Sequence, residues 1–347
     1  MALGMQSPIT KTDTAIIEPV VSVILPLYNS AKDLPSALSQ LVGQSYRNKE
    51  IILVDDGSSD ETYSMASELS KKIDHIILSK TDHMGASHAR NVGASKSRGA
   101  ILFFAESDCV YDADYIQKAV DSLVSEPGAG AVCLTGAPLI TRPTLATRCI
   151  DVENKVQHKL LREGKIRPFY AWVYRKETFT KLGGFDENLF QGEDRDLFSR
   201  LKAANYSVTW VPGVNWRHRR DQTILDMSRK WVGRGRTRVL LTLKHRQAYE
   251  LLKDLLPLWA TVGGILLLTL YPLGGAAVLF IVAAAFVSKS VRVASISWSE
   301  VRNKRVFLAY PYFLLVRNFS MGMGYSLALA RIAVLKVQRK KLSWSKI

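Results

Sequence analysis

The sequence predicts an α/β fold with a mostly parallel sheet, followed by a membrane region. Strand-like and helix-like segments alternate through the first half of the 347 residues, and the strands are continuous apolar runs. This combination is typical of a parallel sheet with helices on both faces. Charged residues are frequent up to position 254 and missing from 255 to 288, which marks the boundary of the membrane region.

The alternation can be followed element by element. Apolar strands are predicted within residues 21–29, 49–55, 74–80, 100–105 and 130–136, and helices within 31–44, 61–73, 85–99 and 112–127. In the first of these helices Leu34, Leu38 and Leu41 share one face, as helical periodicity requires. Ligands of such sheets bind beyond the carboxyl ends of the strands, where two acidic clusters fall here.

The uncharged run of residues 255–288 contains 34 residues. One helix needs about 20 to span a bilayer, so the run is long for one span and short for two. The central "YPLGG", residues 271–275, favours a hairpin of two spans, with a buried pair of soluble helices as the alternative. A second apolar segment, residues 306–335, carries Arg317 midway and is expected to be an interfacial or re-entrant element before a basic tail.

The net charge of +16 calls for an anionic partner, either nucleic acid or a membrane surface. The excess of Lys and Arg lies between 217 and 246 and again between 331 and 346, beside the apolar segments. This placement favours the membrane and no nucleic acid, and it puts the α/β domain on the cytoplasmic side. Three cysteines without a CxxC pair predict a reducing compartment, and residues 1–18 are expected to form a loose tail without a signal-peptide pattern.

Glu106 and Asp108 follow an apolar strand directly, in "ILFFAESDC". Two carboxylates this close can hold Mg²⁺ or Mn²⁺ when substrate phosphates complete the shell. A solvated turn is the alternative. Asp55 and Asp56 end another strand, where a carboxylate can accept hydrogen bonds from a base or ribose; a helix-capping role remains open.

Glu193, Asp194 and Asp196 crowd the start of a predicted helix in "GEDRDLFSRL". Acids near a helix N-terminus are favourable in any case, but three in four positions exceed that need. Crowding and partial burial can raise one pKa and create a general base. His218 stands among arginines in "WRHRRD"; it is either a neutral metal ligand or a surface histidine.

Together these segments resemble the family 2 glycosyltransferases, inverting enzymes with the GT-A fold. The resemblance covers roughly residues 21–238 and rests on "VSVILPLYN", "VDDGSSDET", "MGASHARNVGASKSRGAILFFAESDC" and "LGGFDE…GEDRDLFSRL" in this order. It implies a Rossmann-like nucleotide-sugar-binding domain over residues 19–245 and a membrane region over 246–347. The part after 254 resembles a membrane-bound subset that builds polysaccharides or glycolipids.

The resemblance also implies roles for individual residues. Asp194 would be the catalytic base, supported by Glu193. Metal binding would fall to Asp108, Glu106 and His218; the family usually has Asp where this chain has Glu106, so Asp108 is the expected main ligand. Nucleotide binding would fall to Pro26, Tyr28, Asn29, Asp55, Asp56, Arg90 and Ser107.

The implied reaction moves a sugar from a nucleotide-sugar, with a UDP-sugar favoured, to a hydroxyl of a lipid-linked or other glycan acceptor, using Mg²⁺ or Mn²⁺. A polyprenyl-phosphate glycosyl synthase is the nearest alternative. Its acceptor is already a phosphate and needs no strong base, so the "GEDRD" cluster favours a hydroxyl acceptor. An alternative of another class is a basic membrane scaffold without catalysis.

Overall fold

A computed structural model describes residues 18–140, 144–166, 170–189, 191–219, 223–245 and 304–337, with isolated positions between 260 and 298. Its described part contains one sheet of eight strands in the order β3-β2-β1-β4-β7-β6-β8-β5. The strands are β1 (Val21–Leu27), β2 (Lys49–Asp55), β3 (Ile76–Lys80), β4 (Ile101–Phe104), β5 (Cys109–Tyr111), β6 (Ala129–Leu139), β7 (Val173–Arg175) and β8 (Ser207–Arg219).

The sheet is mostly parallel, as the sequence predicted, with β6 and β8 also paired in parallel, but it includes antiparallel pairings that were not predicted. Strands β1 to β4 pair in parallel, as expected from their alternation with helices. Strand β7 then pairs antiparallel with both β4 and β6, and β5 pairs antiparallel with β8. The prediction missed this because β5 and β7 are only three residues long and give no periodic signal.

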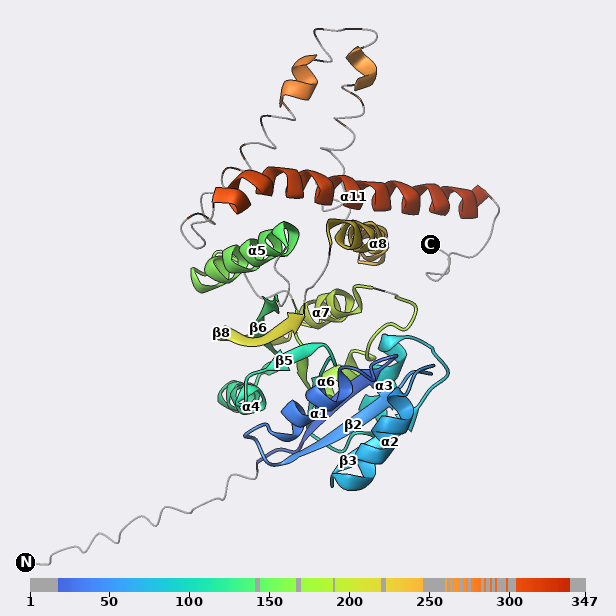
Figure 1. Ribbon diagram of the computed structural model, residues 1–347, viewed down its shortest axis with the longest axis vertical. Helices are drawn as coiled ribbons and strands as arrows, with labels where there is room; N and C mark the ends of the chain where they lie inside the picture. Colours follow the sequence, from blue (N-terminus) through green and yellow to red (C-terminus); the bar gives the residue numbers. More distant parts are fainter. Residues whose placement is uncertain are drawn as a thin grey trace, which may run out of the picture.

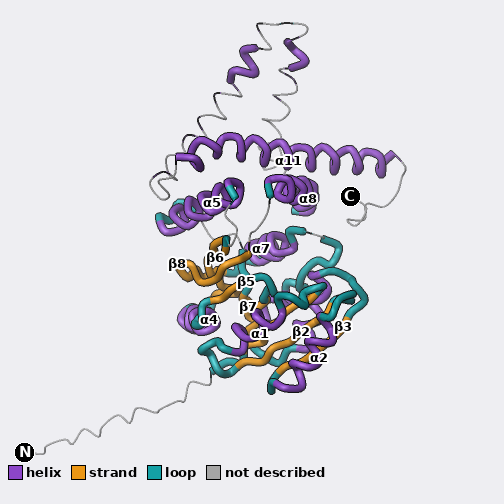
Figure 2. The backbone as a smooth tube through the Cα atoms, in the orientation of Figure 1, coloured by secondary structure: helices purple, strands orange, loops and turns teal. Residues whose placement is uncertain are grey.

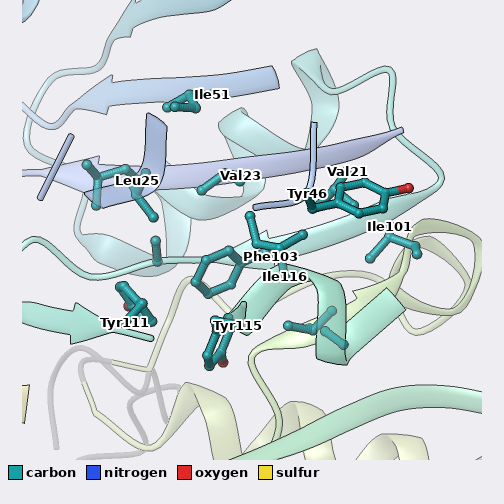
Figure 3. Close-up of a cluster of buried hydrophobic side chains, with 14 of the residues drawn as sticks. Val21, Val23, Leu25, Tyr46, Ile51, Ile101, Phe103, Tyr111, Tyr115 and Ile116 are labelled. Atoms are coloured by element: carbon teal, nitrogen blue, oxygen red, sulfur yellow. The ribbon is translucent and has the colours of Figure 1, made fainter. Parts of the chain in front are cut away.

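Helices cover both faces of the sheet (Figure 1). The helices of the first half are α1 (Leu34–Val42), α2 (Thr62–Lys72), α3 (Ala86–Lys96) and α4 (Tyr115–Ser125), followed by α6 (Lys176–Lys181) and α7 (Glu193–Ala203). On one face α1, α2 and α4 pack on alternate residues of β1, including Val23 and Leu25, with Phe103 and Tyr115 at the centre (Figure 3). On the other face Ile24 packs with residues of α3, α6 and α7.

Three longer helices form a further layer: α5 (Leu145–Arg162), α8 (Ile224–Lys244) and α11 (Lys304–Val337). Figure 2 shows α11 lying across α5 and α8, at the end of the domain away from the N-terminus. Trp231 of α8 and Phe313 of α11 meet edge to face, with ring centroids 5.2 Å apart. Gly235 of α8 and Gly324 of α11 allow the backbones of the two helices to approach closely. A Cβ added to Gly324 would lie 2.1 Å from the backbone oxygen of Val232.

The ion pair between Arg317 and Glu153 explains the charge within the second apolar segment. Arg317 lies on the inner side of α11, where its guanidinium binds the Glu153 carboxylate of α5; the Tyr310 hydroxyl donates to the same carboxylate at 3.2 Å. Residues 306–335, predicted as interfacial or re-entrant, lie within this one continuous helix.

Some of the predictions concern residues outside the described part. Most of the predicted hairpin, residues 255–288, belongs here, as do residues 1–17 of the predicted tail. The described pieces at 265–268 and 276–281 are helical and lie beyond α11 (Figure 1). None of the helices in the described ranges is both long enough and apolar enough to cross a bilayer.

Candidate active site

The predicted site residues gather where β1, β2 and β4 end. In the parallel register Leu27 of β1 lies beside Asp55 of β2, and Ile24 beside Phe104 of β4. The loops that leave β2 and β4 therefore start on either side of β1. This arrangement brings two acidic segments, residues 55–56 and residues 106–108, to one edge of the sheet.

Glu106, Asp108 and His218 converge on one point. The Nε2 atom of His218 lies 3.4 Å from Asp108 Oδ2 and 3.8 Å from Glu106 Oε2. The pairing of β5 with β8 causes this, because it places Cys109 opposite His218. Two carboxylates and an imidazole suit a divalent cation such as Mg²⁺ or Mn²⁺.

Cys109 belongs to the same group of side chains. Its ligand atom and those of Glu106, Asp108 and His218 all lie within 4.8 Å of one another. Burial, and next the charges of Glu106 and Asp108, raise the pKa of the Cys109 thiol. The thiol donates a weak hydrogen bond to Glu106 Oε2 at 3.5 Å. Sequence reasoning missed Cys109 as a site residue, although it directly follows the acidic pair.

Asp55 and Asp56 have different partners. Asp56 is 3% exposed, and its carboxylate accepts hydrogen bonds from the backbone of Met84 and Gly85, each at 2.8 Å. It thereby fastens the loop before α3. Asp55 is fully buried; its Oδ2 accepts from the Ser58 backbone at 3.2 Å, whereas Oδ1 has no hydrogen-bond partner among the described residues. A buried acceptor without a donor is unusual in a native protein.

The end of β1 lies against the loop that follows β2. Asn29, in a left-handed conformation with φ 47°, accepts a hydrogen bond from the Ser59 backbone at 2.9 Å. Tyr28 is 47% exposed and stacks on His83, with ring centroids 4.2 Å apart. Pro26 lies within β1, and Ser107 Oγ lies 3.4 Å from Ser30 Oγ at the start of the same loop. His83 gave no signal in the sequence, because its partner is distant along the chain.

Arg90 of α3 connects the two groups of acids. Its guanidinium binds Glu193 Oε1 at 2.8 Å and Glu106 Oε1 at 3.4 Å, and it lies over the Trp172 ring, 5.1 Å from the centroid. The side chain is 5% exposed. Arg90, which was predicted to lie near the nucleotide, thus contacts two site carboxylates.

Glu193 and Asp194 begin α7, after Gly192 with φ 78°. Burial raises the pKa of Glu193, and the Arg90 charge opposes this rise without cancelling it. Asp194 is half-buried, and its Oδ1 accepts from the Arg195 backbone at 2.8 Å. Asp194 therefore keeps a carboxylate oxygen for another donor, while Glu193 is engaged with Arg90.

Tyr174 is a further residue that sequence reasoning missed. It lies on β7, and its hydroxyl is buried without a hydrogen-bond partner among the described residues. Burial, followed by the charge of Asp194, raises the pKa of this hydroxyl. The short strand β7 therefore places a buried tyrosine within the electrostatic influence of the predicted base.

Asp196, the third acid of the cluster, faces the interior. It is fully buried and binds Arg200 Nε at 2.9 Å, Lys244 Nζ at 2.7 Å and His245 Nε2 at 2.9 Å. Lys244 also binds Asp186 at 2.6 Å. These contacts attach the start of α7 to the end of α8, and they give Asp196 a structural role distinct from that of Asp194.

Comparison with known proteins identifies the class of domain. Residues 22–183 match the family model described as Glycosyl transferase family 2. Glycosyltransferase AglE of Haloferax volcanii is 28% identical over 202 residues, covering 56% of this chain and 66% of that protein. The O-antigen chain rhamnosyltransferase RfbN of Salmonella typhimurium is 26% identical over 224 residues, covering 62% of this chain and 71% of that protein.

The fold is shared with a solved enzyme. A mannosyltransferase from Pyrobaculum calidifontis, in complex with GDP-Man and Mn²⁺, superposes with a TM-score of 0.56 at 17% identity, covering 94% of this chain and 89% of that chain. The chain spans about half to two thirds of the length of several curated relatives, with 66%, 50% and 59% in three of them.

Proposed function

We propose, starting from a glycosyltransferase domain of family 2 over residues 22–183, that this chain transfers a sugar from a nucleoside-diphosphate sugar to an acceptor hydroxyl with inversion. The observation that carries the proposal is the buried Arg90, which joins the carboxylate of Glu106 to that of Glu193. Two acidic groups with different chemical tasks, cation binding and proton removal, are thereby held side by side.

The donor nucleotide fits the edge at β1 and β2. The unpaired Oδ1 of Asp55 is an acceptor for a ring N–H, which uracil and guanine both carry. Tyr28, stacked on His83, offers an exposed aromatic ring on which a base can stack. We favour a UDP-sugar as donor. Asp56 supports this site indirectly, because its hydrogen bonds hold the adjacent loop.

Glu106, Asp108 and His218 are the residues that would hold a divalent cation. When bound, such a cation neutralises the negative charge that develops on the departing diphosphate. Asp108 is the expected main ligand, since its side chain is 44% exposed and faces His218, whereas Glu106 is shared with Arg90.

Asp194 takes the part of the general base. It accepts the proton of the acceptor hydroxyl while the hydroxyl oxygen forms a bond to the anomeric carbon. The bond between that carbon and the diphosphate oxygen breaks, and its electron pair leaves with the nucleoside diphosphate. One displacement from the opposite face inverts the configuration.

We also propose that the acceptor is lipid-linked and that the chain works at a membrane. Leu308, Tyr312, Leu315 and Phe319 form an apolar stripe on the outer face of α11 and are between 55% and 76% exposed. The helix contains no acidic residue, so its cations suit anionic headgroups. Ile265, Leu273 and Phe280, between 55% and 88% exposed, lie in the segment predicted to form two spans. The excess of Lys and Arg beside this segment supports a cytoplasmic catalytic domain.

Replacement of Asp194 by Asn tests the reaction. The full-length protein in detergent is screened for donor hydrolysis across nucleotide sugars with Mn²⁺ or Mg²⁺, then for transfer to glycan acceptors and to bare polyprenyl phosphate. Asp194→Asn should lose transfer by about 10²-fold or more but keep donor affinity by calorimetry. Asp114→Asn, at an exposed carboxylate immediately before α4, is the matched control. Near-normal turnover of Asp194→Asn, or transfer only to polyprenyl phosphate, would contradict the proposal.

A further inference from the structure

The cation site contains a sulfur atom that the proposed reaction does not use. Cys109 follows Asp108 directly and is 2% exposed. It lies on β5 opposite His218 of β8, so the two side chains are cross-strand neighbours. The other two cysteines, Cys133 and Cys149, are free and buried outside this group.

Three separations within the group are close to those of a tetrahedral zinc site. Around a Zn²⁺ ion with ligand bonds of about 2.0–2.3 Å, the ligand atoms lie about 3.3–3.7 Å apart. Asp108 and His218 are 3.4 Å apart, Glu106 and Cys109 3.5 Å, and Glu106 and His218 3.8 Å. The remaining separations are within 4.8 Å, so small side-chain movements close the shell.

We infer that Glu106, Asp108, Cys109 and His218 form a second, closed coordination mode of this site, which binds Zn²⁺ or another thiophilic divalent cation. Mg²⁺ and Mn²⁺ prefer oxygen ligands and leave the thiol as a hydrogen-bond donor to Glu106. Zn²⁺ recruits the sulfur as a thiolate, and the thiol proton goes to solvent. Thiolate sulfur, imidazole nitrogen and carboxylate oxygen are all zinc ligands, and closed zinc sites are almost always four-coordinate.

A closed shell has a consequence for catalysis, which rests on the proposed function. Four protein ligands leave no open position on the ion, whereas a catalytic site keeps one for substrate. Zn²⁺ bound in this mode therefore excludes the donor diphosphate. Because zinc binds such donor sets more tightly than Mn²⁺, low zinc concentrations inhibit transfer.

Cobalt is the first probe, because it adopts zinc geometry and reports its ligands by absorption. Co²⁺ added to the full-length protein without any donor should give a sulfur-to-cobalt charge-transfer band and intense tetrahedral d–d bands. Cys109→Ser should lose the charge-transfer band, and Cys149→Ser, at an equally buried cysteine, should keep it. The zinc affinity of Cys109→Ser should fall by about tenfold or more, since even partners outside the ligand shell cost 10–100-fold.

X-ray absorption on the zinc-loaded wild-type protein does not depend on the folding of any variant. It should show one sulfur at about 2.3 Å with nitrogen or oxygen neighbours at about 2.0–2.2 Å. A shell of nitrogen and oxygen alone, or a cobalt band that survives in Cys109→Ser, overturns the inference. Neither measurement needs a donor or an acceptor, so failure of the zinc inference can be distinguished from failure of the proposed transferase reaction. Zinc should also weaken Mn²⁺-dependent UDP binding by calorimetry in the wild type.

Discussion

Replacing Arg90 by Met should destabilise the protein more than the loss of any surface ion pair. The guanidinium is 5% exposed and binds Glu193, which is 16% exposed, at 2.8 Å. It also contacts Glu106 and the Trp172 ring. Met keeps much of the apolar volume but leaves Glu193 buried without a compensating charge.

The size of the effect follows from this burial. Removing one partner of a buried ion pair costs about 3–5 kcal/mol, and the partial exposure of Glu106 favours the lower end. At about 2 °C or more per kcal/mol, the midpoint of thermal unfolding should fall by roughly 6–10 °C. The double variant Arg90→Met/Glu193→Gln should recover part of this loss, because the glutamine carries no charge to leave unpaired.

Thermal unfolding in detergent and EDTA, followed by circular dichroism, measures both effects without a contribution from bound metal. Arg229→Met is the control, since Arg229 is 72% exposed and lies 3.8 Å from Asp226; it should cost about 0–1 kcal/mol. A cost of Arg90→Met no larger than that of this control would contradict a buried ion pair, as would a double variant in which Glu193→Gln adds its full cost to the loss.

Three further predictions concern the helical layer, the buried acid and the cation. Gly324→Ala should lower stability by about 1–3 kcal/mol in thermal unfolding, despite a helix-propensity gain of about 1 kcal/mol, because its Cβ would meet the Val232 backbone oxygen; an unchanged midpoint would contradict the helix crossing. Burial opposes the ionisation of Asp196, but Lys244 and Arg200 outweigh burial and lower the pKa of this carboxyl. The ionised carboxylate therefore stabilises the fold above the unfolded pKa of about 3.9, and this stabilisation is lost as the pH falls below that value. Asp196→Asn should therefore flatten the acid limb of the stability–pH curve, and an unaltered limb would argue against this role. Removal of divalent cations with EDTA should abolish donor binding in calorimetry, and Mn²⁺ should restore it; undiminished binding in EDTA would exclude the proposed cation role.

Sequence patterns predicted the elements whose signals are local. The alternation that gave β1 to β4 and α1 to α4 depends on neighbouring residues, and the structure confirmed an α/β fold with these elements. The antiparallel strands β5 and β7 were missed because three residues carry no period. Their absence from the prediction also hid the pairing that brings Cys109 to His218.

Individual roles within the site depended on distant partners. Asp55 and Asp56 were equal candidates in the sequence, and their different hydrogen-bond partners in the structure distinguish them. Arg317 was an anomaly in an apolar segment until Glu153, 164 positions away, supplied its partner. Such pairings depend on tertiary structure, so no window of the sequence contains them.

The contact between α8 and α11 at Gly235 and Gly324 holds these two helices together independently of the residues that connect them. A Cβ on Gly235 would lie 2.2 Å from the Met321 backbone oxygen, so the two helices meet backbone to backbone. Residues 245–303 therefore connect two helices that are already in contact with each other. Changing the length of an insert alters loop-closure entropy by only about 0.6 kcal/mol per doubling. The segment between these helices can accordingly change in length or sequence while α8 and α11 keep their mutual position.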